Sequence, residues 1–199
     1  MRMAKVLKPI GGYDFGTAAV PPSPVSLEEL ELLLRTVSLS DEDLRWLRRA
    51  GEVLADQTGA VVGAWREAIA ENPHLACYYG SHSGEADPGY KVSVGERFKQ
   101  WILDVCLRPY DRAWLDYQHE IGRRHTHLRK NMADDAAALP HIPLRYLIAF
   151  TAVINDRIKP FLAHGSSREE VEAMHSAWCK AVLLHVAVWS RPYVAESDW

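Results

Sequence analysis

The chain has 199 residues, of which 48% are hydrophobic and 25% charged, so it can bury a full core and is expected to form one domain. Its formal net charge of −3 leaves no excess of basic residues to bind nucleic acid or an anionic membrane, so neither is an expected partner. It contains no apolar run near the roughly 18 residues that cross a bilayer and no signal peptide, which predicts a cytoplasmic protein.

The N-terminal part of the chain predicts an irregular arm followed by a helix. Residues 1–25 contain four prolines and several glycines, which interrupt regular structure. Ser26, with Glu29 three residues later, is a capping box, and leucines at helical spacing follow it. We therefore expect an arm over residues 1–25 and one helical domain over residues 26–199.

The next two helices are predicted from a cap and a proline. Ser40 precedes three acidic residues, which favour the positive end of a helix dipole, and the helical pattern runs to about Thr58. A further helical stretch covers residues 60–70 and ends before Pro73, because proline has no N–H to continue the helix. A short segment over residues 74–79 then enters a polar loop rich in glycine, serine and proline.

The central part of the chain contains the most informative helix. Residues 89–107 predict one helix, which Pro109 ends. Residues 111–128 predict the next, because alternating steps of four and three residues separate Trp114, Gln118, Ile121, His125 and Leu128. These positions share one face, so His125 is expected to point into the core near the end of this helix.

Two long helices complete the pattern. The first covers residues 143–163 and ends at His164 and Gly165, a cationic residue and a glycine that suit a helix C-terminus. The second covers residues 167–190 and buries one face, made of Val171, Met174, Trp178, Ala181, His185 and Trp189. Because alternating β-branched patterns are almost absent, the chain is predicted to be all-α.

An inward histidine among aromatic residues can hydrogen-bond within the core, ligate a protein-bound metal or ligate haem iron. Periodicity gives His185 the same standing as His125, so spacing alone does not choose between them. A zinc or di-iron site is disfavoured, because Glu172 and His175 have no second copy and His127 lies on the opposite face from His125. The three cysteines lack C-x-x-C spacing, and no nucleotide, hydrolase or metalloprotease motif occurs.

Several stretches of the chain resemble the protoglobins, the single-domain relatives of the globin-coupled sensors. The similarity keeps the same order and covers nearly the whole chain, including the arm. The stretches are AGEVLADQ (50–57), NPHLACYY (72–79), RFKQWILD (97–104), YDRAWLDYQHEIGRRH (110–125), LPHIPLRYLIAF (139–150), KPFLA (159–163) and AWCKAVLLHVAVWSRPYV (177–194).

The resemblance implies an all-α globin fold, a three-over-three helical sandwich with an extra N-terminal helix and arm, that binds one haem b. Because no C-x-x-C-H motif occurs, the haem would be held without a covalent bond. The family's proximal iron ligand matches His125. Its distal pocket matches Trp65, Phe98, Phe150 and Ile154, although plain core packing would also explain these four residues.

Other residues are expected around the haem by the same resemblance. Arg66 stands where the family usually has a tyrosine that donates to dioxygen, so a guanidinium either lies near the ligand or turns outward. Tyr79 could supply a substitute hydroxyl. Arg97 resembles a propionate-binding position, for which a solvated surface charge is an equal alternative. The rest of the expected pocket consists of Trp101, Tyr117 and Ile121.

The function implied by the resemblance is reversible binding of O2, CO or NO at a five-coordinate iron, as a gas sensor or carrier. A homodimer is expected through the last helices, with Met174, Trp178, Val182 and Trp189 at the contact unless they form the core of one chain. The alternative is a haem enzyme acting on NO, nitrite or peroxide, or an engineered carbene-transfer scaffold, and a cationic Arg66 would favour small anionic ligands. A haem-free helical regulator, with a structural His125, is a third interpretation.

Overall fold

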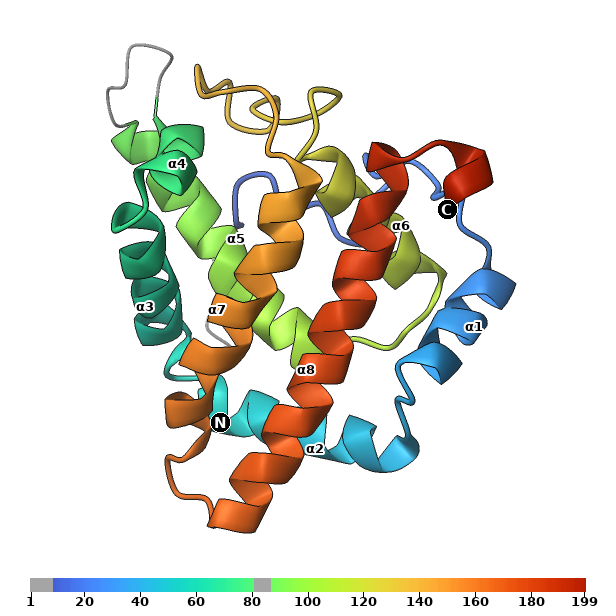
Figure 1. Ribbon diagram of the computed structural model, residues 1–199, viewed down its shortest axis with the longest axis vertical. Coiled ribbons are helices and arrows are strands. Elements are labelled where there is room, and N and C mark those ends of the chain that lie inside the picture. Colours follow the sequence, from blue (N-terminus) through green and yellow to red (C-terminus); the bar gives the residue numbers. More distant parts are fainter. Residues whose placement is uncertain (1–8, 81–86) are drawn as a thin grey trace, which may run out of the picture.

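The computed structural model describes residues 9–80 and 87–199, and these residues are helical with no strand (Figure 1). The prediction of an all-α chain is therefore confirmed. The first eight residues of the expected arm, and residues 81–86 of the expected polar loop, lie outside the described residues. The α-helices are α1 (Leu27–Thr36), α2 (Asp41–Leu54), α3 (Thr58–Ala70), α4 (Pro73–Ala76), α5 (Pro88–Leu107), α6 (Arg112–Arg123), α7 (Leu144–Leu162) and α8 (Arg168–Ser190), and the 3-10 helices are η1 (Cys77–Tyr79), η2 (Arg191–Tyr193) and η3 (Glu196–Asp198).

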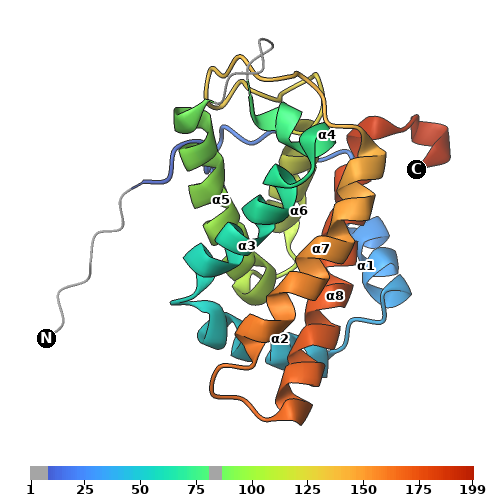
Figure 2. The ribbon, with the colours of Figure 1, turned by 60° about the vertical axis from the view of Figure 1, so that its left-hand side comes forward.

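The six long helices are arranged as two layers of three. Helix α2 packs against α5 and α8, and α8 also packs against α6 and α7. Helix α3 packs against α5 and α7. One layer thus contains α2, α5 and α6 and the other α3, α7 and α8, and both views show α7 and α8 side by side (Figures 1 and 2). Within one layer, α5 and α6 make few contacts with each other, which leaves room between them.

Three of the helices begin at serine caps, and two of these, Ser26 and Ser40, were predicted from the sequence. The side chains of Ser26, Ser40 and Ser167 each accept a hydrogen bond from the backbone N–H three residues later, and the acidic residue at that position bonds back to the serine N–H. Gly165, which follows α7, has a φ of +70°, a left-handed conformation that glycine adopts without strain. Local sequence therefore fixes where these helices start and stop.

Helix α6 ends earlier than predicted. It ends at Arg123, and the Thr126 hydroxyl then donates to the Arg123 carbonyl and accepts from the N–H of Leu128. Such local side-chain bonds compete with the helical ladder and close a turn. The prediction that Leu128 shares the buried face was wrong, because its side chain is 46% exposed. Similarly, α2 ends at Leu54 and not near Thr58, where α3 begins.

The predicted inner face of α8 forms much of the core. All six of its residues are buried, and Trp178 packs edge-to-face against Trp101 of α5. The four α8 residues expected at a contact between subunits, Met174, Trp178, Val182 and Trp189, are also buried inside this one chain. Their expected place at an interface is therefore corrected, because a side chain that packs in its own core is not available to a second subunit. None of the helices within residues 9–80 and 87–199 combines the length and apolar character of a membrane span.

Candidate functional site

A cavity separates helices α5 and α6. On α5 its wall consists of residues at helical spacing, Tyr90, Val94, Arg97, Phe98, Trp101 and Asp104, and on α6 and the turn after it of Tyr117, Ile121, Arg124, His125 and Lys130. A second, adjoining cavity extends toward α7 and α8, where Phe150 and Ile154 line it. Tyr79, Phe98, Trp101, His125, Ile142 and Trp189 line both. We call the two together the central cavity.

His125 lies just beyond the end of α6 and faces the central cavity. Its Nδ1 lies 2.8 Å from the carbonyl oxygen of Ile121, and since a carbonyl can only accept, Nδ1 carries the proton and donates. Desolvation by burial lowers the pKa of His125 to about 4, so the ring is neutral at pH 7. Among the described residues no partner is found for Nε2, which is left as an unprotonated lone pair. A neutral imidazole fixed in this way is suited to ligate a metal.

The Trp189 ring packs on the His125 ring. The two ring centroids are 5.6 Å apart with an interplanar angle of 25°, and the Trp189 Nε1 donates to the Oε1 of buried Gln118, 3.0 Å away. Close helix packing permits this arrangement, because a Cβ on Gly122 of α6 would lie 2.8 Å from the Trp189 carbonyl oxygen. Sequence reasoning placed Trp189 on the inner face of α8 but missed its position beside His125.

The other expected distal residues divide into two groups. Phe98, Trp101, Phe150 and Ile154 line the central cavity as expected, as do Tyr117 and Ile121 on the His125 side. Trp65 is buried behind them, edge-to-face against Phe98 and Trp101. Arg66 lies in a separate cavity between α3 and α5. Tyr79 lines both that cavity and the central one, so its ring stands between the two.

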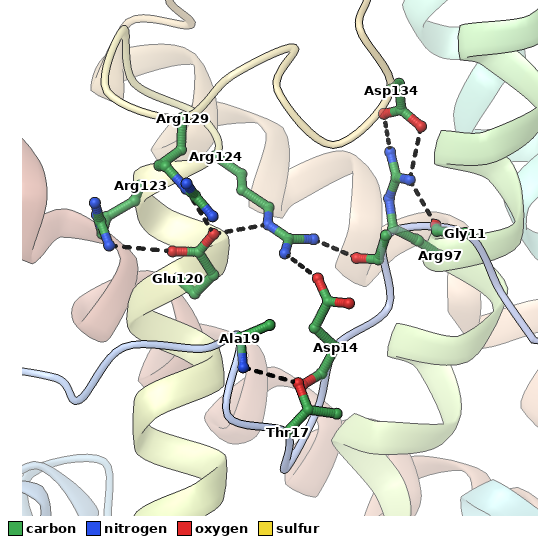
Figure 3. A network of polar contacts seen from close by, with 11 residues as sticks. Gly11, Asp14, Thr17, Ala19, Arg97, Glu120, Arg123, Arg124, Arg129 and Asp134 are labelled. Carbon is green, nitrogen blue, oxygen red and sulfur yellow. Dashed lines mark hydrogen bonds and ion pairs between the residues drawn. The ribbon is translucent and has the colours of Figure 1, made fainter.

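Arg97 is on the wall of the cavity but is already paired. Its guanidinium donates to both carboxylate oxygens of Asp134, at 2.9 and 2.5 Å, and to the carbonyl of Gly11 in the arm (Figure 3). The alternative of a solvated surface charge is therefore ruled out for Arg97, because its side chain and that of Asp134 are 16% and 9% exposed. Asp134 would have to share this arginine with any anionic group that entered the cavity.

A network of arginines around Glu120 joins α6 to the arm (Figure 3). The Glu120 carboxylate is 1% exposed and pairs with Arg123, Arg124 and Arg129. Arg124 also donates to the Gly12 carbonyl and, at 2.8 Å, to Asp14. A buried carboxylate is stable only when it is paired in this way. The network holds the arm against the edge of the cavity, where Tyr13 completes the lining and donates to Asp104 at 2.7 Å.

Lys130 is a buried cation that pairs with no carboxylate among the described residues, and sequence reasoning missed it. Its side chain lines the central cavity, and its Nζ donates to the Tyr78 carbonyl at 3.1 Å and to Asn131 Oδ1 at 3.0 Å. No carboxylate within residues 9–80 and 87–199 pairs with it. Desolvation by burial lowers the pKa of Lys130 to about 8. Because a buried charge is stable only when it is paired, an anionic group bound in the cavity would stabilise the Lys130 ammonium.

His185 differs from His125 in what surrounds it. Its Nδ1 accepts from the Nε1 of Trp101 at 3.0 Å, so Nε2 carries the proton, and this buried N–H has no partner in the described part of the chain. Burial lowers the pKa of His185 to about 3. The ring lines neither part of the central cavity and packs in the core.

The donor set suits a haem, and its fit requires some opening of the cavity. Each feature of the cavity matches a part of haem. The imidazole lone pair of His125 can ligate the iron, the apolar walls suit the faces of the ring, and the cations Arg97, Arg124 and Lys130 suit its two carboxylates. The two parts of the central cavity measure about 120 and 70 Å³, below the roughly 300–1,000 Å³ of typical ligand pockets. Side chains between α5 and α6 must therefore move apart to admit the group. No cluster of three metal-ligating side chains occurs among the described residues.

Comparison with known proteins agrees with this site. The family model for protoglobin matches residues 26–199, a range that begins at the capping box of α1 and includes His125. No curated protein matches the chain. The family match implies a haem globin with a small gas as its ligand, on the two-layered helical fold described above. The chain belongs to the protoglobin family.

Proposed function

We propose that this protoglobin binds one haem b without a covalent link, with His125 as its axial ligand, and reversibly binds O2, CO or NO as a sensor or carrier. The observation that carries the proposal is the unpartnered Nε2 of His125 in an apolar cavity, with Nδ1 held by the Ile121 carbonyl. Ferrous haem, when bound, supplies an open coordination position for a diatomic gas.

The protein's own residues would orient the haem and keep water out. The bond from Nδ1 to the Ile121 carbonyl fixes the ring and makes Nε2 a better electron donor. Phe98 and Trp101 on one side, and Ile121 on the other, supply apolar walls. Lys130, with Arg97 and Arg124, would hold the propionates, because a charge-assisted hydrogen bond to a carboxylate is stronger than a neutral one.

Replacement of the axial histidine tests the proposal directly. We expect His125→Ala to lose haem absorption in the Soret region after reconstitution with hemin, and imidazole to restore part of it by filling the space. The control is His127→Ala, which removes an exposed neighbouring histidine and should leave the ferrous and CO-bound spectra unchanged. A His125→Ala protein with the same Soret band and CO spectrum as the unchanged chain would refute the assignment.

We also infer that the protein forms a homodimer through α7 and α8. The residues that support this inference are Ile148 on α7 and Leu183 on α8, which are 54% and 51% exposed. Large exposed apolar side chains on paired helices are suited to cover one another in a second subunit. In this proposal Ile148 and Leu183, and not the four buried α8 residues named in the sequence analysis, form the contact between the subunits.

A further inference from the structure

A cavity apart from the central cavity lies between α3 and α5, and in it the Arg66 guanidinium has no ion-pair partner among the described residues. It measures about 220 Å³, and its lining includes Arg66 of α3, Lys91 and Gly95 of α5, and Tyr79 of η1. A Cβ built on Gly95 would lie 3.1 Å from the Nη1 of Arg66. The absence of a side chain at Gly95 therefore lets the guanidinium lie close against α5, although glycine inside a helix is unfavourable. We call this space the Arg66 cavity.

The Arg66 cavity contains hydrogen-bond donors for which residues 9–80 and 87–199 supply no acceptor. In the described part of the chain neither Arg66 nor Lys91 forms an ion pair or a side-chain hydrogen bond, and no carboxylate lines the cavity. By contrast, Arg97 and Arg124 on the far side of Phe98 are both paired with carboxylates. Burial raises the pKa of Tyr79, so its hydroxyl keeps its proton and is a further donor. Two cations and a hydroxyl in one half-enclosed space attract an anion.

The size and shape of the cavity select the class of anion. A volume of about 220 Å³ is below that of a typical organic-ligand pocket but is large enough for a small ion with a few waters. A guanidinium offers two parallel N–H groups, which match the two oxygens of a planar oxyanion. The geometry points to a binding site for a small planar oxyanion of the nitrite type, formed by Arg66, Lys91 and Tyr79 and separate from the iron.

The site adjoins the central cavity through two aromatic side chains. Tyr79 and Phe98 line both spaces, so an anion held by Arg66 would lie one side-chain layer from the space in front of His125. Any effect of this anion on the iron would rest on the proposed function. The anion site itself rests on the charges and the volume, and is independent of haem.

The test titrates the CO complex of the ferrous protein with sodium nitrite at constant ionic strength. With CO on the iron, nitrite binding reports the Arg66 cavity, and the diamagnetic complex permits NMR. We expect saturable shifts of the Gly95 amide. Arg66→Gln should weaken nitrite binding at least about tenfold, because it removes a charge-assisted hydrogen bond. Lys91→Gln should weaken it about threefold, because the lysine charge is more solvated. Gly95→Ala, which keeps every charge, should also weaken binding by pushing the guanidinium aside.

The control is Arg45→Gln, because Arg45 is an exposed arginine of α2 without an ion pair in the described structure. An equal loss in Arg45→Gln, unchanged affinity in Arg66→Gln, or no saturable binding by the unchanged chain would overturn the site. The same titration on haem-free protein separates the two proposals. Arg66-dependent binding there would support the anion site even if His125→Ala had already refuted the haem assignment.

Discussion

Three histidines are kept neutral by burial. Desolvation lowers the pKa of His119 to about 4, of His125 to about 4 and of His185 to about 3. His125 and His185 also differ in tautomer, since the first donates through Nδ1 and the second accepts there. The tautomer matters for the proposed function, because among these three histidines it is His125 that presents an unprotonated nitrogen to the central cavity. It is set by tertiary neighbours and not by spacing along the chain.

The depressed pKa values predict acid sensitivity. The unfolded chain binds protons on these histidines below pH about 6.5, whereas the folded chain does not, so stability is full above that pH and is lost as pH falls toward the folded values. Each such histidine should lower the free energy of unfolding by about 1.4 kcal/mol per pH unit in that window. We expect the free energy of unfolding, measured by urea titration at each pH from 8 to 4.5, to fall as the pH falls. His185→Gln should reduce the slope of this free energy against pH by the equivalent of one proton. The exposed His164→Gln should leave the slope unchanged, and an unchanged slope in His185→Gln would contradict the prediction.

Residue patterns predicted which side chains face inward, but they did not predict the ion-pair and hydrogen-bond partners of those side chains. The inward position of His125 follows from its spacing to Ile121, and the cavity confirms it. Asp134 as the partner of Arg97, and the position of Lys130 in the cavity, could not be predicted. Both depend on the non-helical segment after α6, which has no periodic pattern to read.

At the scale of helices, hydrophobic spacing located each long element but not every end. The pattern from Trp114 to Leu128 continues past the true end of α6, because the turn made by Thr126 adds residues whose apolar spacing matches a helix by chance. The serine caps of α1 and α2 were predicted correctly, since a serine cap is a local interaction. A helix end can therefore be predicted from the sequence when neighbouring residues alone make the hydrogen bonds that fix it.

The crossing of α6 and α8 gives a prediction for Gly122, with Gly63 of α3 as its control. A Cβ at Gly122 would lie 2.8 Å from the Trp189 carbonyl oxygen and 2.9 Å from its Cα, which are backbone atoms and cannot rotate away. Gly122→Ala should therefore push the helices apart and lower the free energy of unfolding by about 1–3 kcal/mol, measured by urea denaturation. At Gly63 in α3 a Cβ would meet nothing within 4 Å, so Gly63→Ala should raise stability by about 0.5–1 kcal/mol. Equal effects at the two sites would show that the crossing is not tight.

At the scale of the whole molecule, the layering came from the family resemblance and not from any pattern of residues. Periodicity gives lengths and inner faces of helices, but which helices pack together depends on long-range contacts such as that of α2 with α8. The arm is a second case. Its composition indicates irregular structure, but its attachment through Asp14 and Arg124, 110 residues apart, has no signature in the sequence.

The proposed homodimer can be tested through the exposed faces of α7 and α8. These helices run antiparallel from the turn that joins them, so Ile148 and Leu183 lie at similar distances from it (Figure 1). A charge at either position inside an interface would be buried without a partner, which costs several kcal/mol. We therefore expect Ile148→Glu and Leu183→Glu to shift the mass measured by light scattering after size exclusion from two chains to one.

The matched control is Leu128→Glu in the segment after α6, a position that is 46% exposed and outside α7 and α8. It adds the same charge to an exposed leucine, so it separates an interface effect from a general effect of surface charge on association. We expect its mass to remain that of two chains. A monomeric unchanged chain, or dimers that persist in both Ile148→Glu and Leu183→Glu, would remove α7 and α8 as the interface, because a buried glutamate at either position could not be accommodated without a partner.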